Sequence, residues 1–415
     1  MIFGNMNTVK ESFNKNVSHM FVVYWAILVI WQNISRIQAR TTVDLIIKIG
    51  LLIYFSWFYI RKSKKLNAKF LIVYLLAFSL IFTAFNDESL TFSAIISYVY
   101  PIIFLTMVYG LGDSFEISLN HLLSFYDRII LITLYAALYA IIFCWDQFAS
   151  AFFIHNAYGN ELSSFFVSSH EYGLYLVAAI IACMMCLKYK APMVRGKKFY
   201  YIIAIVILSV NLILTYSRTA SFSLVIFLVL YIVLGKGKMK RWLIFITILV
   251  IAIILYVPEL TEYFYNIVLK RNQLGQREQM YVYAIDYYLE GTLIDKLFGY
   301  GVNATKAVFV AEHGHDYVHN AYLQALLNFG IIGFSCLISF IISQILASFK
   351  LMKKDHFMGT INLGLCLTAS AIMFTNTTLV FSSPIDSFFL TIFMFIVPKY
   401  VRNAIENDRF YQNSR

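Results

Sequence analysis

One arginine stands at the start of a long apolar run. Residues 215–220 (TYSRTA) join two charge-poor stretches, 199–216 and 218–235, with almost no loop between them. If the second stretch is a helix, its unpaired N–H groups and its positive dipole end face the same spot as the Arg218 guanidinium. That combination suits a phosphate or diphosphate group. The alternative is an arginine that only extends its side chain to the membrane surface.

A second candidate is a group of histidines in front of another apolar run. Residues 312–320 (EHGHDYVHN) contain His315 and His319. Imidazoles and a carboxylate could bind a metal, although their spacing matches no closed zinc pattern, or the histidines could be plain surface residues. The third interpretation takes His319 as a general base, because imidazole has a pKa of about 6.5. His315 and Asn320 are then candidate substrate-binding residues.

A third polar group opens the apolar run 171–189. Ser168 and Glu171 have the spacing of a capping box, which predicts a helix start at this point. Glu171 is therefore either a capping residue or a weaker candidate base. His170 lies between them, and we expect it to line the mouth of the site together with Glu171.

The segment 258–321 is the only long interruption between apolar runs. Its stretch 277–288 (REQMYVYAIDYY) places apolar residues at helical spacing, so one face is expected to lie on the membrane or on the rest of the protein. Arg271 lies shortly before this stretch, and Arg277 is its first residue. The segment is too apolar to be disordered, and a connection this long is usually functional.

The composition decides which elements must hold these residues. Of the 415 residues, 60% are hydrophobic, 18% aromatic and only 13% charged. Soluble domains carry roughly 25% charged residues, so a soluble protein is excluded, and so is a disordered one. The sequence predicts an all-α polytopic membrane protein of one domain, 1–415, with about 12 transmembrane helices. The expected spans are 18–34, 43–60, 68–85, 91–110, 128–148, 171–189, 199–216, 218–235, 241–257, 322–348, 359–380 and 385–400.

The positive charges predict how the spans are oriented. Lys and Arg gather in alternate connections, at 61–69, 188–198, 236–241 and 350–354, and cytoplasmic loops collect these residues. Both termini are then cytoplasmic, no cleaved leader is expected, and 258–321 lies outside. The net charge of +11 follows from this rule and predicts no nucleic-acid partner.

The cysteines point to packing and not to redox chemistry. The five cysteines all fall in apolar stretches, and their number is odd, so a disulfide framework is not expected. Cys183 and Cys186 are more simply small packing residues than a redox or metal motif.

Several motifs together resemble one membrane family. SRTA at 217–220, Arg277 followed by FGYG at 298–301, and HNAYL at 319–323 followed by NFGIIGF at 328–334 stand in the same order and topological places as the signatures of the O-antigen ligase/polymerase-like superfamily. The resemblance covers roughly residues 180–335. The N-terminal half is similar only as a pattern of spans.

The resemblance implies a GT-C-like glycosyltransferase bundle in the bacterial plasma membrane that acts on undecaprenyl-diphosphate-linked glycans at the outer face. The positions that match the family's functional residues are Arg218, Arg277 and His319, with Arg271 close enough to Arg277 to compete for its role. No cofactor and no metal are expected. The bilayer and the lipid-linked oligosaccharide are the expected partners, with a chain-length regulator and a flippase as candidate protein partners.

Three functions compete on this basis. A polymerase joins lipid-linked repeat units of O-antigen, capsule or exopolysaccharide, and it is the reading we favour from the resemblance. A ligase transfers the finished chain to a lipid-core acceptor. A flippase or other transporter is of a different class, but transporters hold ionisable residues near the middle of the bilayer, where only Lys48 clearly falls.

Overall fold

The structure is a computed structural model of the chain that describes residues 71–87, 98, 119–153, 161–164, 166, 168–192, 196–256, 274–314 and 318–375. The regular elements of this part are all α-helices, as the composition predicts. Five of them, α6, α8, α9, α16 and α17, are long and apolar enough to cross a membrane. The count of about 12 spans is not confirmed, because the expected spans 18–34, 43–60 and 385–400, and 91–110 apart from Tyr98, lie outside the described residues.

The described helices follow the apolar runs of the sequence, and α13, α14 and α15 lie in the described part of the long segment before α16. In chain order they are α3 (Leu71–Asn86), α6 (Leu119–Phe143), α7 (Trp145–Phe153), α8 (Ser169–Tyr189), α9 (Lys197–Leu214), α10 (Arg218–Leu234), α11 (Lys238–Tyr256), α13 (Leu274–Glu290), α14 (Leu293–Phe298), α15 (Val302–His313), α16 (Ala321–Lys354) and α17 (His356–Thr375). The expected span 128–148 is corrected by the structure: α6 ends at Phe143 and α7 begins after a bend at Cys144.

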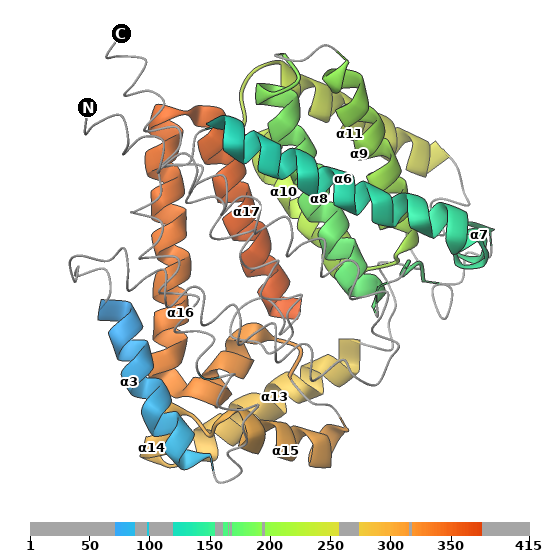
Figure 1. Ribbon diagram of the computed structural model, residues 1–415. Coiled ribbons are helices and arrows are strands. Elements are labelled where there is room, and N and C mark those ends of the chain that lie inside the picture. Colours follow the sequence, from blue (N-terminus) through green and yellow to red (C-terminus); the bar gives the residue numbers. More distant parts are fainter. Residues whose placement is uncertain are drawn as a thin grey trace, which may run out of the picture.

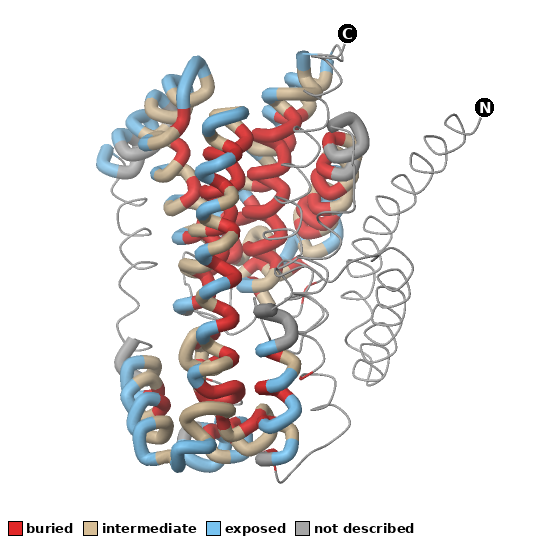
Figure 2. Tube along the Cα trace, turned by 90° about the vertical axis from the view of Figure 1, so that its left-hand side faces the viewer, coloured by how far each residue is buried: buried red, intermediate tan, exposed pale blue. Residues whose placement is uncertain are grey.

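The core of the bundle surrounds α8. Every residue from Tyr172 to Cys186 is buried, because α6, α9 and α10 all pack against this helix. A second layer follows, in which α17 packs between α10 and α16, and α3 packs on α16. Figure 2 shows that the buried residues line the inner sides of the helices, with exposed residues on the outer sides. Many of the exposed side chains are large and apolar, such as Phe78, Leu131 and Phe222, which fits a helix bundle in lipid.

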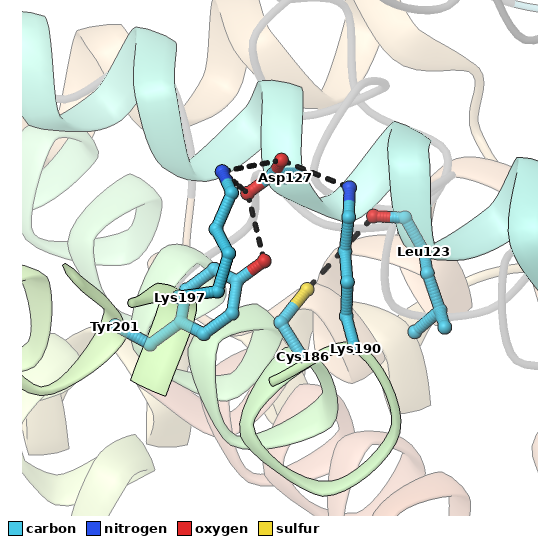
Figure 3. A network of polar contacts seen from close by, with 6 residues as sticks. All are labelled: Leu123, Asp127, Cys186, Lys190, Lys197 and Tyr201. Carbon is cyan, nitrogen blue, oxygen red and sulfur yellow. Dashed lines mark hydrogen bonds and ion pairs between the residues drawn. The ribbon is translucent and has the colours of Figure 1, made fainter. Parts of the chain in front are cut away.

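One end of the bundle, here called the lysine end, is held by ion pairs. Nζ of Lys190 and Nζ of Lys197 lie 2.9 and 3.1 Å from Oδ2 of Asp127, and the Tyr201 hydroxyl donates to Oδ1 of the same carboxylate (Figure 3). Tyr189 donates to Asp355 at 3.2 Å and joins the end of α8 to the turn between α16 and α17. Lys190 and Lys197, from a connection expected in the cytoplasm, therefore lie at the same end as the turn after Lys354, which follows another such cluster.

The opposite end, here called the loop end, carries the helices of the long segment. Figure 1 shows α13, α14 and α15 together there, beside the start of α16. The capping box of Thr292 and Asp295 fixes the start of α14. Met280 and Ala284 of α13 are buried, so the amphipathic helix expected at 277–288 forms and packs on the protein; Ile285, expected on the same face, is 44% exposed.

At the loop end, α16 breaks at Gly330, and the residues before the break contact the glycine motif at 298–301. Gly330 has φ 64° and ψ −171°, a conformation open only to glycine, so the span expected over 322–348 is not one straight helix. The break frees carbonyl groups of the preceding turn, and the N–H groups of Tyr300 and Gly301 donate to the Leu327 and Asn328 carbonyls at 2.8 and 3.2 Å. The 298–301 loop thereby braces the first turns of α16.

Candidate functional site

Arg218 is the first residue of α10, as the sequence predicts. The connection from α9 is only residues 215–217, and Tyr216 adopts a left-handed backbone (φ 50°) while its hydroxyl donates to the Ala151 carbonyl at 2.8 Å. Ser217 caps α10, because its Oγ accepts from the Ala220 N–H at 3.3 Å. Arg218 therefore stands at the positive end of a helix, and this residue is partly exposed.

The start of α8 meets the start of α10. Oγ of Ser168 accepts from the His170 N–H at 3.1 Å, so the predicted cap at Ser168 is confirmed. Nδ1 of His170 lies 3.0 Å from Oγ of Ser217. A Cβ added to Gly173 would stand 2.7 Å from the Ala220 Cβ, which shows how close the two helices are. Two positive helix ends thus converge beside Arg218, with Glu171 on the first turn of α8.

The register between α10 and α17 fixes the level of Arg218. The two helices run antiparallel: Phe227 lies against Gly364, and the Thr368 hydroxyl donates to the Ser223 carbonyl at 3.4 Å. Continued toward the loop end, this register brings Arg218 to the level of the last turn of α17. That turn ends at Thr375 in the described part of the chain.

The same turn of α17 contacts α13 and α16. The Tyr281 hydroxyl lies 3.2 Å from the Phe374 carbonyl, and the Tyr322 hydroxyl donates to the Ser370 carbonyl at 2.9 Å. Arg277 precedes Tyr281 by one turn on α13 and is close enough to lower the pKa of Tyr281, although burial has the larger effect and leaves that pKa above its ordinary value. The helix that carries Arg277 and the helix that begins with Arg218 therefore meet the same end of α17.

His319 stands at the start of α16 in a left-handed conformation, with φ 57°. The Tyr281 hydroxyl is also 3.2 Å from its carbonyl oxygen. Asn320 is the N-cap of α16, and its Oδ1 accepts from the N–H groups of Tyr322 and Leu323 at 3.0 and 3.1 Å. The imidazole thus leaves the chain one residue before a well-capped helix start.

The candidate residues of the sequence fall into two groups. The structure brings six of them to the loop end: His170, Glu171, Arg218, Arg277, His319 and Asn320. Arg271 and His315 lie outside the described residues. In the described part no three His, Cys, Asp or Glu side chains gather as possible metal ligands, and the five cysteines are all free thiols.

Two sets of contacts that support the site were not predicted from the sequence. Tyr281 was only one tyrosine among many, and no local signal distinguished it. The second is a brace on α15: the Tyr98 hydroxyl donates to Asp87 at 2.6 Å, and the N–H groups of Val302 and Asn303 donate to Tyr98 and Asp87 at 2.9 and 3.3 Å. Neither could be seen from spacing, because the partners of Tyr281 lie 38 and 93 residues away, and the α15 residues lie 204 and 216 residues from Tyr98 and Asp87.

A bundle of long apolar helices of this kind is the architecture of a multi-pass membrane protein. Residues 203–338, from α9 to the middle of α16, match the model of the O-antigen ligase family. The match contains Arg218, Arg277 and His319, and it confirms the resemblance to the O-antigen ligase/polymerase-like superfamily. The matched segment is thus similar to O-antigen ligases, a family of glycosyltransferase-like membrane enzymes of the ligase or polymerase type. None of the curated proteins matches the chain.

Proposed function

We propose that this protein is a glycosyltransferase that polymerises undecaprenyl-diphosphate-linked oligosaccharide repeat units on the outer face of the bacterial plasma membrane. One observation carries the proposal: the Tyr281 hydroxyl of α13, the helix of Arg277, lies 3.2 Å from both the His319 carbonyl and the Phe374 carbonyl in the last turn of α17. The antiparallel register of α10 and α17 brings Arg218 to the level of the same turn. Both termini are then cytoplasmic, and the loop end with segment 258–321 faces outward, within a GT-C-like bundle.

The reaction needs positive charge on one side and a base on the other. The acceptor hydroxyl forms a bond to the anomeric carbon of the donor sugar, and the bond from that carbon to the diphosphate oxygen breaks with its electron pair leaving on the diphosphate. Arg218 and Arg277 stabilise the charge that develops there, and His319 takes the hydroxyl proton. Loss of one such charged donor typically reduces the rate by about 10²–10³.

The remaining candidates have supporting roles in this proposal. His170, at the meeting point of α8 and α10, and Arg271 add positive or hydrogen-bonding groups near the diphosphate. Glu171 is the alternative base. Asn320 holds the start of α16 through its cap, and His315 is assigned to substrate binding. Two cations and two helix starts supply the electrostatic stabilisation, so the proposed reaction needs no metal ion.

A ligase is the second candidate, since the family model that matches is that of O-antigen ligase. The two reactions share the donor and the chemistry and differ in the acceptor. In the polymerase the acceptor hydroxyl belongs to another lipid-linked repeat unit, and in the ligase it belongs to a lipid core.

The decisive experiment incubates the purified protein with undecaprenyl-diphosphate-linked oligosaccharides extracted from the source cells, with and without a lipid-core acceptor. A ladder of products without the core indicates a polymerase, and product only with the core indicates a ligase. Arg218→Ala and His319→Ala should each abolish the product while expression and membrane insertion stay unchanged. Arg241→Ala, which removes an exposed cation from the start of α11 at the lysine end, is the matched control. Wild-type turnover in either site variant would refute the assignment.

A further inference from the structure

One tyrosine hydroxyl joins three elements of the site. The Tyr281 hydroxyl of α13 lies 3.2 Å from the His319 carbonyl oxygen at the start of α16 and 3.2 Å from the Phe374 carbonyl oxygen in the last turn of α17. A phenol has a single proton, so the two equal distances describe a hydrogen bond shared between the two carbonyl groups. Loss of this hydroxyl would free α13 from both helices at once.

The His319 backbone needs such support. A residue other than glycine at φ 57° is in a left-handed conformation that costs about 1–2 kcal/mol, so its surroundings must hold it there. Asn320 holds the chain on the C-terminal side by capping α16. The bond to the His319 carbonyl fixes the intervening peptide plane, and this plane helps to set the direction in which the imidazole leaves the backbone.

The inference rests on the proposed function and deepens it. We propose that Tyr281 is a positioning residue for His319: its hydroxyl holds the backbone that presents the imidazole to the acceptor hydroxyl. Through the same bond it holds α13, and with it Arg277, against the end of α17. Tyr281 thus couples the placement of the base to the placement of one diphosphate-binding arginine.

The hydroxyl stays protonated under working conditions. Burial raises the pKa of Tyr281 above its ordinary value, and the nearby Arg277 charge lowers it by less. Since only the protonated phenol can donate, this bond is present throughout the range in which an imidazole acts as a base.

The test compares Tyr281→Phe with a matched control on the same helix. Tyr288 also donates from its hydroxyl to a backbone carbonyl, that of Lys296 at 3.0 Å, but this bond joins α13 to α14 and reaches neither His319 nor α17. Tyr281→Phe should lower kcat for glycan transfer about tenfold, which corresponds to about 1.4 kcal/mol, and leave KM for the lipid-linked donor within about twofold. Tyr288→Phe should leave kcat within about twofold of wild type.

A second readout does not depend on activity. Amide hydrogen exchange over residues 318–323 should be faster in Tyr281→Phe than in wild type and unchanged in Tyr288→Phe. If the wild type transfers no glycan but this exchange pattern is found, the proposed function fails and the structural role of the hydroxyl stands. The positioning role is overturned if Tyr281→Phe keeps wild-type kcat, if only KM changes, or if both variants lose activity alike.

Discussion

The replacement of Gly330 by alanine tests how the start of α16 is held. A Cβ added at Gly330 would lie 2.3 Å from the Leu297 carbonyl oxygen and 2.4 Å from its carbon, which belong to the main chain and cannot rotate away. The backbone conformation itself costs about 1–3 kcal/mol for alanine. Separation of the two segments would also break the hydrogen bonds of the Tyr300 and Gly301 N–H groups, at about 1 kcal/mol each. We therefore expect Gly330→Ala to lower the free energy of unfolding by about 3–5 kcal/mol.

Gly314→Ala is the matched control for this substitution. Gly314 also has a positive φ, of 67°, but no atom lies within 4 Å of its added Cβ, so only the backbone cost of about 1–2 kcal/mol applies. The assay is thermal unfolding of the purified protein in detergent, together with the initial rate of glycan transfer. Gly330→Ala should show a much lower melting temperature than Gly314→Ala and should lose activity, because the segment that carries His319 is no longer braced. Equal stability of the two variants would refute the proposed role of the glycine contact.

Three further predictions test other parts of the molecule. Asp127→Asn should lower the free energy of unfolding by about 1–3 kcal/mol, because it weakens the bonds of this side chain to the lysines. The activity of the protein that remains folded should not change. A loss of that activity would show that the lysine end affects the site at the loop end. Ser217→Ala removes the cap of α10, so unfolding and turnover assays should show a loss of about 1 kcal/mol and a slower reaction, whereas wild-type values in both would deny the cap this role. In intact cells, a membrane-impermeant thiol reagent should label Glu290→Cys and not Lys353→Cys; the reverse would place the loop end in the cytosol and end the proposal of outer-face transfer.

The sequence could predict much of the local structure. A composition with 60% hydrophobic residues leaves membrane helices as the main solution, since backbone groups in lipid must bond within their own segment. The start of α8 was predicted from the cap at Ser168, and the starts of α10 and α16 from the limits of the apolar runs; the structure shows that Ser217 and Asn320 cap these two helices. These features depend on residues within one or two turns of each other, so they can be read along the chain.

Only part of the candidate site could be predicted from the sequence. Arg218, Arg277 and His319 could be proposed one at a time, because each lies beside a recognisable helix start or motif. The break of α16 at Gly330 could not be predicted, since a glycine inside an apolar run is equally compatible with a straight helix. The sequence also could not single out Tyr281, whose importance lies in two carbonyl groups far away along the chain.

The difference between the features that the sequence predicted and those it did not has a physical cause. Hydrogen bonding within a helix and burial of apolar side chains in lipid are local or compositional, and the sequence by itself determined them: membrane helices, their approximate limits and their caps. The tertiary structure alone decided that α10, α13, α16 and α17 meet at one end, that the 298–301 loop braces the broken helix, and that one phenol joins three of these elements. Those contacts depend on how helices pack against each other, and packing is set by the whole surface of each helix and not by the spacing of residues within it.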